Sequence, residues 1–133
     1  MQVRITAMSA DIKSRELGVG GPDEAVRLFH KHPWEQELLQ MRSMETKQAN
    51  LSVSPDMTFT ALPGHLVVTA ETVDRFNVEV CLPRPKKFLG LFSRVRFYVF
   101  KNVSRERVSN MIHEFCGDLL EHKHSYFSGK KNA

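Results

Sequence analysis

The second half of the chain is dominated by runs in which apolar and polar residues alternate. Between Arg75 and Leu82 every second residue is apolar, and the run Arg94–Lys101 repeats this alternation. Successive side chains of a β-strand point to opposite faces of a sheet, so each run predicts a strand with one buried face and one wetter face. Two further strand-like runs, Met57–Leu62 and His65–Val73, are separated by a Pro-Gly turn signal. Together the four runs predict an antiparallel meander.

The apolar residues of each run also predict which side chains face the core. In the run Arg75–Leu82 the even-numbered residues are apolar and are expected to face the core, which leaves Arg75 and Glu79 on the outer face. In the run Arg94–Lys101 the same reasoning assigns Val95, Phe97 and Val99 to the core face. The residues expected on its reverse are Arg94, Arg96, Tyr98 and Phe100. An outer face that mixes arginine with tyrosine is typical of a protein interface.

Helical segments flank the predicted meander. Pro22 followed by two acidic residues predicts a helix start, because proline loses no needed hydrogen bond there and acids meet the positive end of the helix dipole. Pro33 ends this helix and begins a second one that runs to about Lys47. Ser104 is the expected N-cap of the last helix, whose apolar residues follow the i, i+3, i+4, i+7 spacing. The sequence therefore predicts an α+β two-layer sandwich, with two N-terminal helices and one C-terminal helix on one face of about four antiparallel strands.

Length and composition favour one soluble domain. The chain has 133 residues, of which 41% are hydrophobic and 26% charged, close to the averages for globular proteins. We expect a single α+β domain over residues 22–121, a loosely ordered lead-in over residues 1–21, with one edge strand at Val3–Ile5 as the alternative, and a flexible tail over residues 122–133. No apolar run is long enough for a membrane span, and two cysteines do not suggest a disulfide scaffold. A cytoplasmic location is expected, because the first ten residues do not have the pattern of a secretion signal.

The basic residues are concentrated in one segment. The net charge of the whole chain is +4, but residues 84–107 contain eight basic side chains and a single acid, Glu106. The eight are Arg84, Lys86, Lys87, Arg94, Arg96, Lys101, Arg105 and Arg107. Such an excess attracts an anionic partner such as an acidic protein or a nucleic acid; the alternative is a solvated face that only maintains solubility.

Sequence motifs for catalysis, metal binding and cofactor binding are incomplete. The pair His113-Glu114 opens an HExxH pattern, but position 117 is glycine, so the second zinc ligand is missing. Two His-Lys-His runs, at 30–32 and 122–124, lack acidic or cysteine residues at ligand spacing. We therefore predict no catalytic residue, no metal site and no cofactor. An enzyme whose groups converge only in three dimensions is left open.

The connection between the last two predicted strands, residues 83–93, is the main candidate for a binding segment. It is eleven residues long and mixes basic with bulky apolar side chains, and loops of this length are often functional. The alternative is that Phe88 and Phe92 pack beneath the edge of the sheet. The expected partner-binding residues are Arg84, Lys86, Lys87, Phe88, Leu91 and Phe92 from this segment and Arg75, Glu79, Arg96 and Tyr98 from the sheet.

Two hypotheses on function follow. In the first, the chain is a small non-enzymatic cytoplasmic protein of the adaptor, chaperone or immunity type, which binds an acidic partner protein through its sheet face and the 83–93 loop. In the second, it is a basic nucleic-acid- or phosphate-binding module. Sheets that bind RNA carry aromatic residues on the open face of central strands, and the outer set of Arg75–Leu82 has none, which favours the first hypothesis. A homodimer is compatible with either.

Overall fold

The computed structural model describes residues 3–9, 13–47, 54–61, 64–83 and 95–120 of the chain. Along the chain, two strands are followed by two helices, four further strands and a last helix. They are β1 (Val3–Met8), β2 (Ser14–Gly20), α1 (Pro22–Lys31), α2 (Trp34–Lys47), β3 (Asp56–Ala61), β4 (Gly64–Ala70), β5 (Arg75–Pro83), β6 (Val95–Ser104) and α3 (Arg105–Leu120).

The strands of the described residues form one antiparallel sheet in the order β2-β1-β3-β4-β5-β6. The predicted α+β class, the antiparallel sheet and the three helices are confirmed, but the sheet has six described strands rather than about four. The two additional strands, β1 and β2, lie within residues 1–21, which the sequence suggested were a loosely ordered lead-in. In β1 the residues Val3, Ile5 and Ala7 are buried against the core, and β1 pairs with both β2 and β3.

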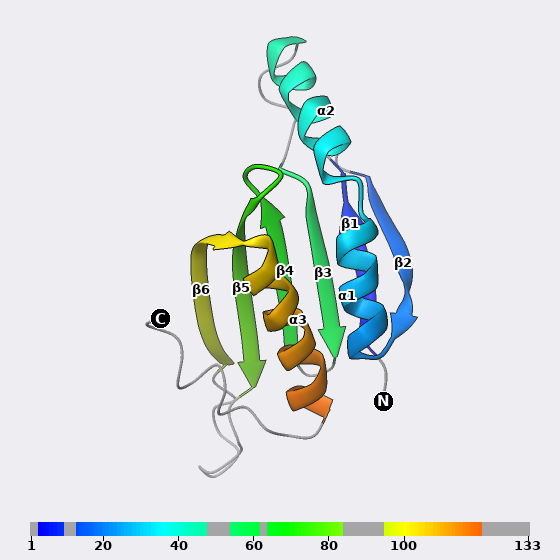
Figure 1. Cartoon of the computed structure of the whole chain (residues 1–133), viewed down its shortest axis with the longest axis vertical. Helices are drawn as coiled ribbons and strands as arrows, with labels where there is room; N and C mark the ends of the chain where they lie inside the picture. The colour runs from blue at the N-terminus through cyan, green and yellow to red at the C-terminus, as the bar shows by residue number, and fades with distance from the viewer. Residues whose placement is uncertain (1–2, 10–12, 48–53, 62–63, 84–94, 121–133) are drawn as a thin grey trace.

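Helices α1 and α3 lie side by side over one face of the sheet (Figure 1). Proline at the first turn and the acids Asp23 and Glu24 begin α1, as the sequence predicts. Ser104 caps α3, because its Oγ accepts a hydrogen bond from the backbone N–H of Arg107 at 3.3 Å. The apolar residues Val108, Ile112 and Phe115 of α3 are fully buried against the core.

Helix α2 departs from the prediction that both N-terminal helices pack on the sheet. It begins at the end of the sheet and extends beyond it (Figure 1). Its first turns are held by the buried residues Trp34 and Leu38, whereas Leu39 is 56% exposed. Only the start of α2 therefore contributes to the core.

An aromatic cluster joins the two N-terminal helices to the sheet. The ring centroids of Phe29 and Phe76 lie 5.3 Å apart, and those of Trp34 and Phe76 also 5.3 Å. The Trp34 indole N–H donates a hydrogen bond of 3.0 Å to the carbonyl oxygen of Phe29. Tilted and edge-on aromatic pairs contribute about 0.5–1.5 kcal/mol beyond the area they bury. This cluster fixes the start of α2 on the core although the rest of α2 lies beyond the sheet.

Strand β6 has the opposite orientation to the one expected from the sequence. Phe97 is 59% and Val99 is 50% exposed, whereas Tyr98 and Phe100 are buried on the helix side. The pairing with β5 decides this, because Tyr98 lies opposite the buried Val80. Residues 97–100 are all apolar, so alternation within β6 could not determine which set faces the core. An irregularity in the β5 register between Phe76 and Val78, near Asn102 with a positive φ of 57°, shifts the pairing of the far end of β6.

Candidate functional site

The face of the sheet opposite the helices, here called the open face, presents two rows of side chains that run across the strands. Both rows follow directly from the pairing registers. The first row is Arg4, Thr60, His65, Cys81 and Phe97, and the second is Thr6, Thr58, Val67, Glu79 and Val99. Three of the four side chains contributed by β1 and β3 are threonines, whereas the β6 end is apolar. The open face therefore changes from polar to apolar toward β6.

The apolar end of the open face consists of Val67, Cys81, Phe97 and Val99, here called the β6 strip. Phe97 and Val99 are among the most exposed large apolar side chains in the described part of the chain. A single exposed apolar residue is ordinary, but two on one strand beside further apolar neighbours form a patch of the kind that marks interaction sites. Glu79 is exposed and lies between Val67 and Val99 in the second row, so it places a carboxylate within the strip.

The two edges of the described sheet differ in how they are protected. At the β2 edge the pairing with β1 is irregular between Ile5 and Thr6, Gly18 has a φ of 154°, and Arg15 and Glu16 are exposed. Bulges, glycines and charges of this kind are how natural sheets discourage further pairing. At the β6 edge, residues 97–100 carry neither charge nor proline. Among the strands that the structure describes, β6 is the edge that is open to a further strand.

Basic side chains surround the end of β6. Lys101 is exposed on β6, and the guanidinium carbon of Arg107 lies 5.7 Å from the centroid of the Phe100 ring. Arg105 has a structural role, because it donates a 2.9 Å hydrogen bond to the carbonyl oxygen of Val73 and lies 5.7 Å from the Phe76 ring centroid. Arg105 and Arg107 thus contact rings that are buried on the helix side, and Lys101 is the described basic residue of β6 that lies exposed beside the apolar strip.

The partner-binding residues expected from the sequence differ in where the structure places them: some are exposed, one is buried and others lie outside the described residues. Arg75 and Glu79 are exposed on β5. The expectation that Tyr98 lies on the outer face is wrong, because it is 9% exposed on the helix side. Arg96 pairs with Leu82 in the β5–β6 ladder, and its side chain lies outside what the structure describes. The remaining candidates, Arg84, Lys86, Lys87, Phe88, Leu91 and Phe92, lie outside the described residues.

Sequence reasoning missed Phe97 and Val99 as exposed residues. The signal that could have found them is the uninterrupted apolar run 97–100, because a strand with apolar residues on both faces must expose one set if helices cover only one face of the sheet. Alternation over Arg94–Lys101 instead predicts that Phe97 and Val99 face the core, and this prediction is wrong.

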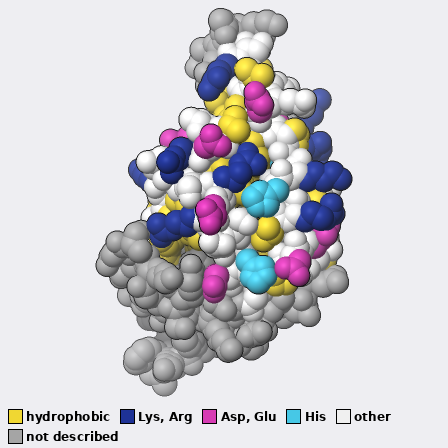
Figure 2. All heavy atoms as spheres, viewed as in Figure 1, with side chains coloured by type: hydrophobic (Ala, Val, Ile, Leu, Met, Phe, Trp, Pro, Cys, Tyr) yellow, Lys and Arg dark blue, Asp and Glu magenta, His cyan; other side chains and the backbone are white. Residues whose placement is uncertain are grey.

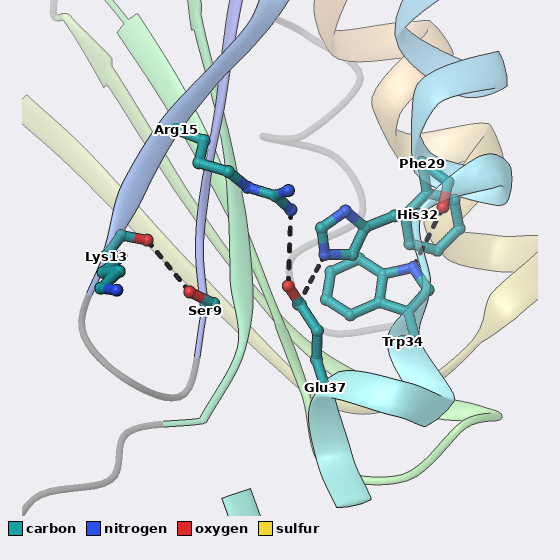
Figure 3. Close-up of polar contacts among 7 residues, drawn as sticks. All are labelled: Ser9, Lys13, Arg15, Phe29, His32, Trp34 and Glu37. Atoms are coloured by element: carbon teal, nitrogen blue, oxygen red, sulfur yellow. Dashed lines mark hydrogen bonds and ion pairs between the residues drawn. The ribbon is translucent and has the colours of Figure 1, made fainter. Parts of the chain in front are cut away.

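A second candidate region is a shallow hollow of about 610 Å³, formed mostly by polar residue types, where β1, β2 and the start of α2 meet. Its lining residues are Ser9, Lys13, Ser14, Arg15, Pro33, Gln36, Glu37 and Gln40. Figure 3 shows Arg15 from β2 and His32 from the α1–α2 connection both pointing toward Glu37. His32 Nε2 lies 2.7 Å from Glu37 Oε2, and the nearest Arg15 nitrogen lies 3.6 Å from Glu37 Oε1.

The geometry indicates that this polar cluster is a structural joint. The side chains of His32 and Glu37 are 2% and 8% exposed, and each Glu37 oxygen is already engaged by a protein group. A buried carboxylate needs such partners to offset the loss of water. The Glu37 carboxylate and burial together raise the pKa of the nearby Asp56 carboxyl to about 6, with burial as the larger cause. The contacts of Glu37 with Arg15 and His32 therefore attach the start of α2 to β2.

The other titratable groups do not assemble into a reactive centre within the described residues. His113 Nε2 lies 3.3 Å from Asp23 Oδ1, but both side chains are well exposed. Cys81 and Cys116 are free and buried, and burial raises the pKa of the Cys116 thiol to about 12. Across the ranges that the structure describes, no group of three or more histidine, cysteine or acidic side chains is placed to hold a metal ion.

The helix side of the molecule has the character of a solvated surface. Figure 2 shows basic and acidic side chains interspersed among the described residues on this side, together with histidines. In the described part of the chain, no helix has both the length and the apolar content that crossing a membrane requires.

Comparisons with protein-family models, with curated proteins and with solved structures found no significant match to this chain.

Proposed function

We propose that this protein binds another protein through the open face of its sheet, with Phe97 and Val99 of β6 as the anchoring side chains. The single observation that carries the proposal is the exposure of these two residues on one strand, 59% and 50%, on the face that the described helices leave uncovered. Burying an exposed phenylalanine and valine stabilises a complex by roughly 1.5–3 kcal/mol for each side chain that becomes fully buried. The proposal places the protein among non-enzymatic binding proteins of the adaptor, chaperone or immunity type.

The charged residues in and near the strip favour a partner whose binding surface is partly polar. Interfaces between proteins that also exist separately typically have an apolar centre and a polar rim. Here Glu79 lies exposed within the strip, and Arg75 on β5 and Lys101 on β6 are exposed beyond it. A partner with an apolar centre and acidic groups toward the Lys101 end would match this arrangement.

A nucleic-acid partner is supported less well by the same surface. Single-stranded nucleic acids bind to aromatic platforms within basic grooves. The open face offers one exposed aromatic side chain among its described residues, Phe97, and Glu79 lies on the next strand. A repulsive carboxylate beside the stacking residue favours a protein partner over a phosphate backbone.

The test compares substitutions of Phe97 and Val99 on β6 with a substitution of the equally exposed Val19 on β2, at the opposite edge of the open face. The tagged full-length chain is used to capture partners from lysate of its native cells, each partner is identified and purified, and binding is measured by calorimetry. We expect Phe97→Asp and Val99→Asp to weaken binding at least tenfold, about 1.4 kcal/mol. Val19→Asp is the matched control, because Val19 is also 50% exposed but lies on β2, opposite Arg4.

The proposal is wrong if no captured protein binds stoichiometrically after purification. It is equally wrong if a purified partner binds Phe97→Asp and Val99→Asp as tightly as the unmodified chain. Circular dichroism of each variant checks that the fold is retained, which is expected because both side chains are exposed.

A further inference from the structure

The open edge of β6 supports a more specific inference, which rests on the proposed function. We propose that the partner contributes an extended segment of alternating acidic and apolar residues, which adds to β6 as an additional strand of the sheet. This mode of recognition uses main-chain hydrogen bonds for affinity and the side chains beside the edge for specificity.

The residue pattern of β6 is the first argument. Residues 97–100 are all apolar or aromatic, a pattern typical of strands that are covered on both faces. Along an edge strand, alternate N–H and C=O groups point away from the sheet and can pair with another chain. Within the described residues β6 pairs only with β5, whereas the opposite edge at β2 has exposed charges, an irregular register and Gly18 at positive φ. Strand β6 also has Lys101, and Asn102 at a φ of 57° beside an irregular register, but residues 97–100 have none of these features, so this stretch of β6 is suited to pairing.

The side chains beside the edge predict what the added segment contains. Residues of an added strand that lie opposite Phe97 and Val99 have their Cβ atoms about 4.5–5.5 Å from them, so apolar side chains suit these positions. Phe97 and Val99 lie on the open face, two residues apart, and the added segment therefore needs apolar residues two apart as well. The same strand addition would extend the β6 strip by one strand's width.

Charge identifies the chemistry of the occupant. Strand β6 and the first turn of α3, residues 95–107, carry Arg96, Lys101, Arg105 and Arg107 against Glu106 as the only acid. A second copy of the chain paired at this edge would bring two such basic sets together, which is unfavourable. An acidic segment of another protein would meet them with opposite charge, which also speeds its association. The charges thus favour a different, acidic protein over self-pairing.

The experiment measures amide hydrogen exchange by NMR on the full-length chain in the presence of defined peptides. The probe is a blocked twelve-residue peptide that alternates valine and glutamate. The controls are a valine–lysine peptide of equal length and the valine–glutamate peptide with one central proline. We expect the β6 amides that exchange rapidly in the free chain to slow at least tenfold with the first probe. We expect at least tenfold weaker binding of both controls.

Variants of the chain make the result specific to this edge. Phe97→Asp should abolish the protection of β6 amides by the valine–glutamate peptide, and Val19→Asp on β2 should leave it unchanged. Strand addition at β6 is overturned if the peptide leaves β6 amides unprotected, if it protects β2 instead, or if the valine–lysine peptide binds equally well. It is also overturned if sedimentation shows a dimer whose β6 amides are all protected without peptide, because a second copy then occupies the edge.

The two proposals can fail separately. If Phe97→Asp abolishes binding of a purified partner while the peptide leaves β6 amides unprotected, the proposed function stands and strand addition is wrong. If no purified partner depends on Phe97 or Val99, the proposed function is wrong whatever the peptides do.

Discussion

Phe97 and Cys81 are direct partners across the β5–β6 ladder, yet Phe97 is 59% exposed and Cys81 only 7%. Opposed side chains on one face of a sheet pack against each other, so the larger ring shields the smaller thiol. His65 lies opposite Cys81 on the other side, in β4. We infer that the aromatic ring at the centre of the β6 strip also protects a free thiol from solvent.

Replacing Phe97 by alanine should therefore make Cys81 reactive. Removing the ring opens the thiol to solvent, and we expect the rate of maleimide labelling of Cys81 to rise on the order of tenfold. Mass spectrometry of the labelled peptides measures the rate at each cysteine separately.

Cys116 is the internal control for this labelling experiment. It is fully buried, and burial raises the pKa of its thiol to about 12, so the reactive thiolate is scarce at neutral pH. Equal labelling of both cysteines in Phe97→Ala would indicate general unfolding. An unchanged rate at Cys81 would show that the ring does not cover the thiol.

The buried pair of His32 and Glu37 should contribute strongly to stability. Removing one partner leaves the other polar group buried without its partner, which typically costs about 3–5 kcal/mol. Arg15 is half exposed and keeps part of the Glu37 interaction, so we expect His32→Ala to lower the free energy of unfolding by about 2–3 kcal/mol. His32→Gln keeps a hydrogen-bond donor and should recover part of this loss.

The comparison for His32 is Arg27→Ala, which removes the exposed pair between Arg27 and Glu24 on α1. Exposed pairs contribute little, so its urea midpoint should match that of the unmodified chain. If His32→Ala unfolds at the same urea concentration as Arg27→Ala, then the polar cluster does not fasten α2.

Asp56 should make the protein less stable as the pH rises. Its pKa is about 6 in the folded chain and 3.8 ordinarily, so the folded state holds its proton more tightly than the unfolded state does. The favourable contribution of this proton is complete below about pH 3.8 and is lost as the pH rises through about 6. Because Asp56 is only partly buried, we expect the loss to be about 1–2 kcal/mol rather than the roughly 3 kcal/mol of a dry site.

The asparagine variant tests this pH dependence. Asp56→Asn should be more stable than the unmodified chain at pH 7.5, and the difference should shrink toward pH 4 in urea unfolding measured at both pH values. Asp74→Asn, in the exposed turn between β4 and β5, should leave the pH dependence unchanged. A stability difference for Asp56→Asn that is the same at both pH values contradicts the raised pKa.

Much of the fold could be predicted because local signals and tertiary structure agree. The alternation in Arg75–Leu82 matches the buried pattern of β5, and the expected N-cap at Ser104 begins α3. Strand β2, with the sequence Ser-Arg-Glu-Leu-Gly-Val-Gly, was not recognised because its charges and glycines disfavour a strand. Pairing with β1 forms this strand in spite of its composition.

The candidate site could be predicted only in part, because the orientation of β6 is a tertiary property. Residues 97–100 are all apolar, so the sequence of β6 alone does not determine whether Phe97 or Tyr98 faces the core. The register of its pairing with β5 determines this, and no local sequence pattern predicts that register. The concentration of basic residues in 84–107 can be predicted directly from the sequence. The exposure of Phe97 and Val99 can be recognised only once the arrangement of the sheet is known.

Two adjacent glycines at the start of α1 should respond oppositely to the same substitution. A Cβ atom at Gly20 would lie 2.6 Å from Glu24 Cγ and 2.7 Å from Glu24 Cβ, so Gly20→Ser forces α1 away from β2. Overpacking of this kind costs about 1–3 kcal/mol. At Gly21, the N-cap of α1, a Cβ atom meets nothing within 4 Å, and no side chain caps the helix.

Gly21→Ser should therefore stabilise the protein by about 0.5–1 kcal/mol, because the hydroxyl can accept a hydrogen bond from the first turn of α1. The backbone at Gly21, with φ −87° and ψ −169°, is already in the extended conformation that N-cap residues adopt. Thermal unfolding of the two variants side by side gives the sign of each effect. Both variants introduce the same side chain, one residue apart, so a difference between them reports the position alone. If both thermal midpoints shift in the same direction, the close contact between Gly20 and Glu24 does not determine how α1 packs.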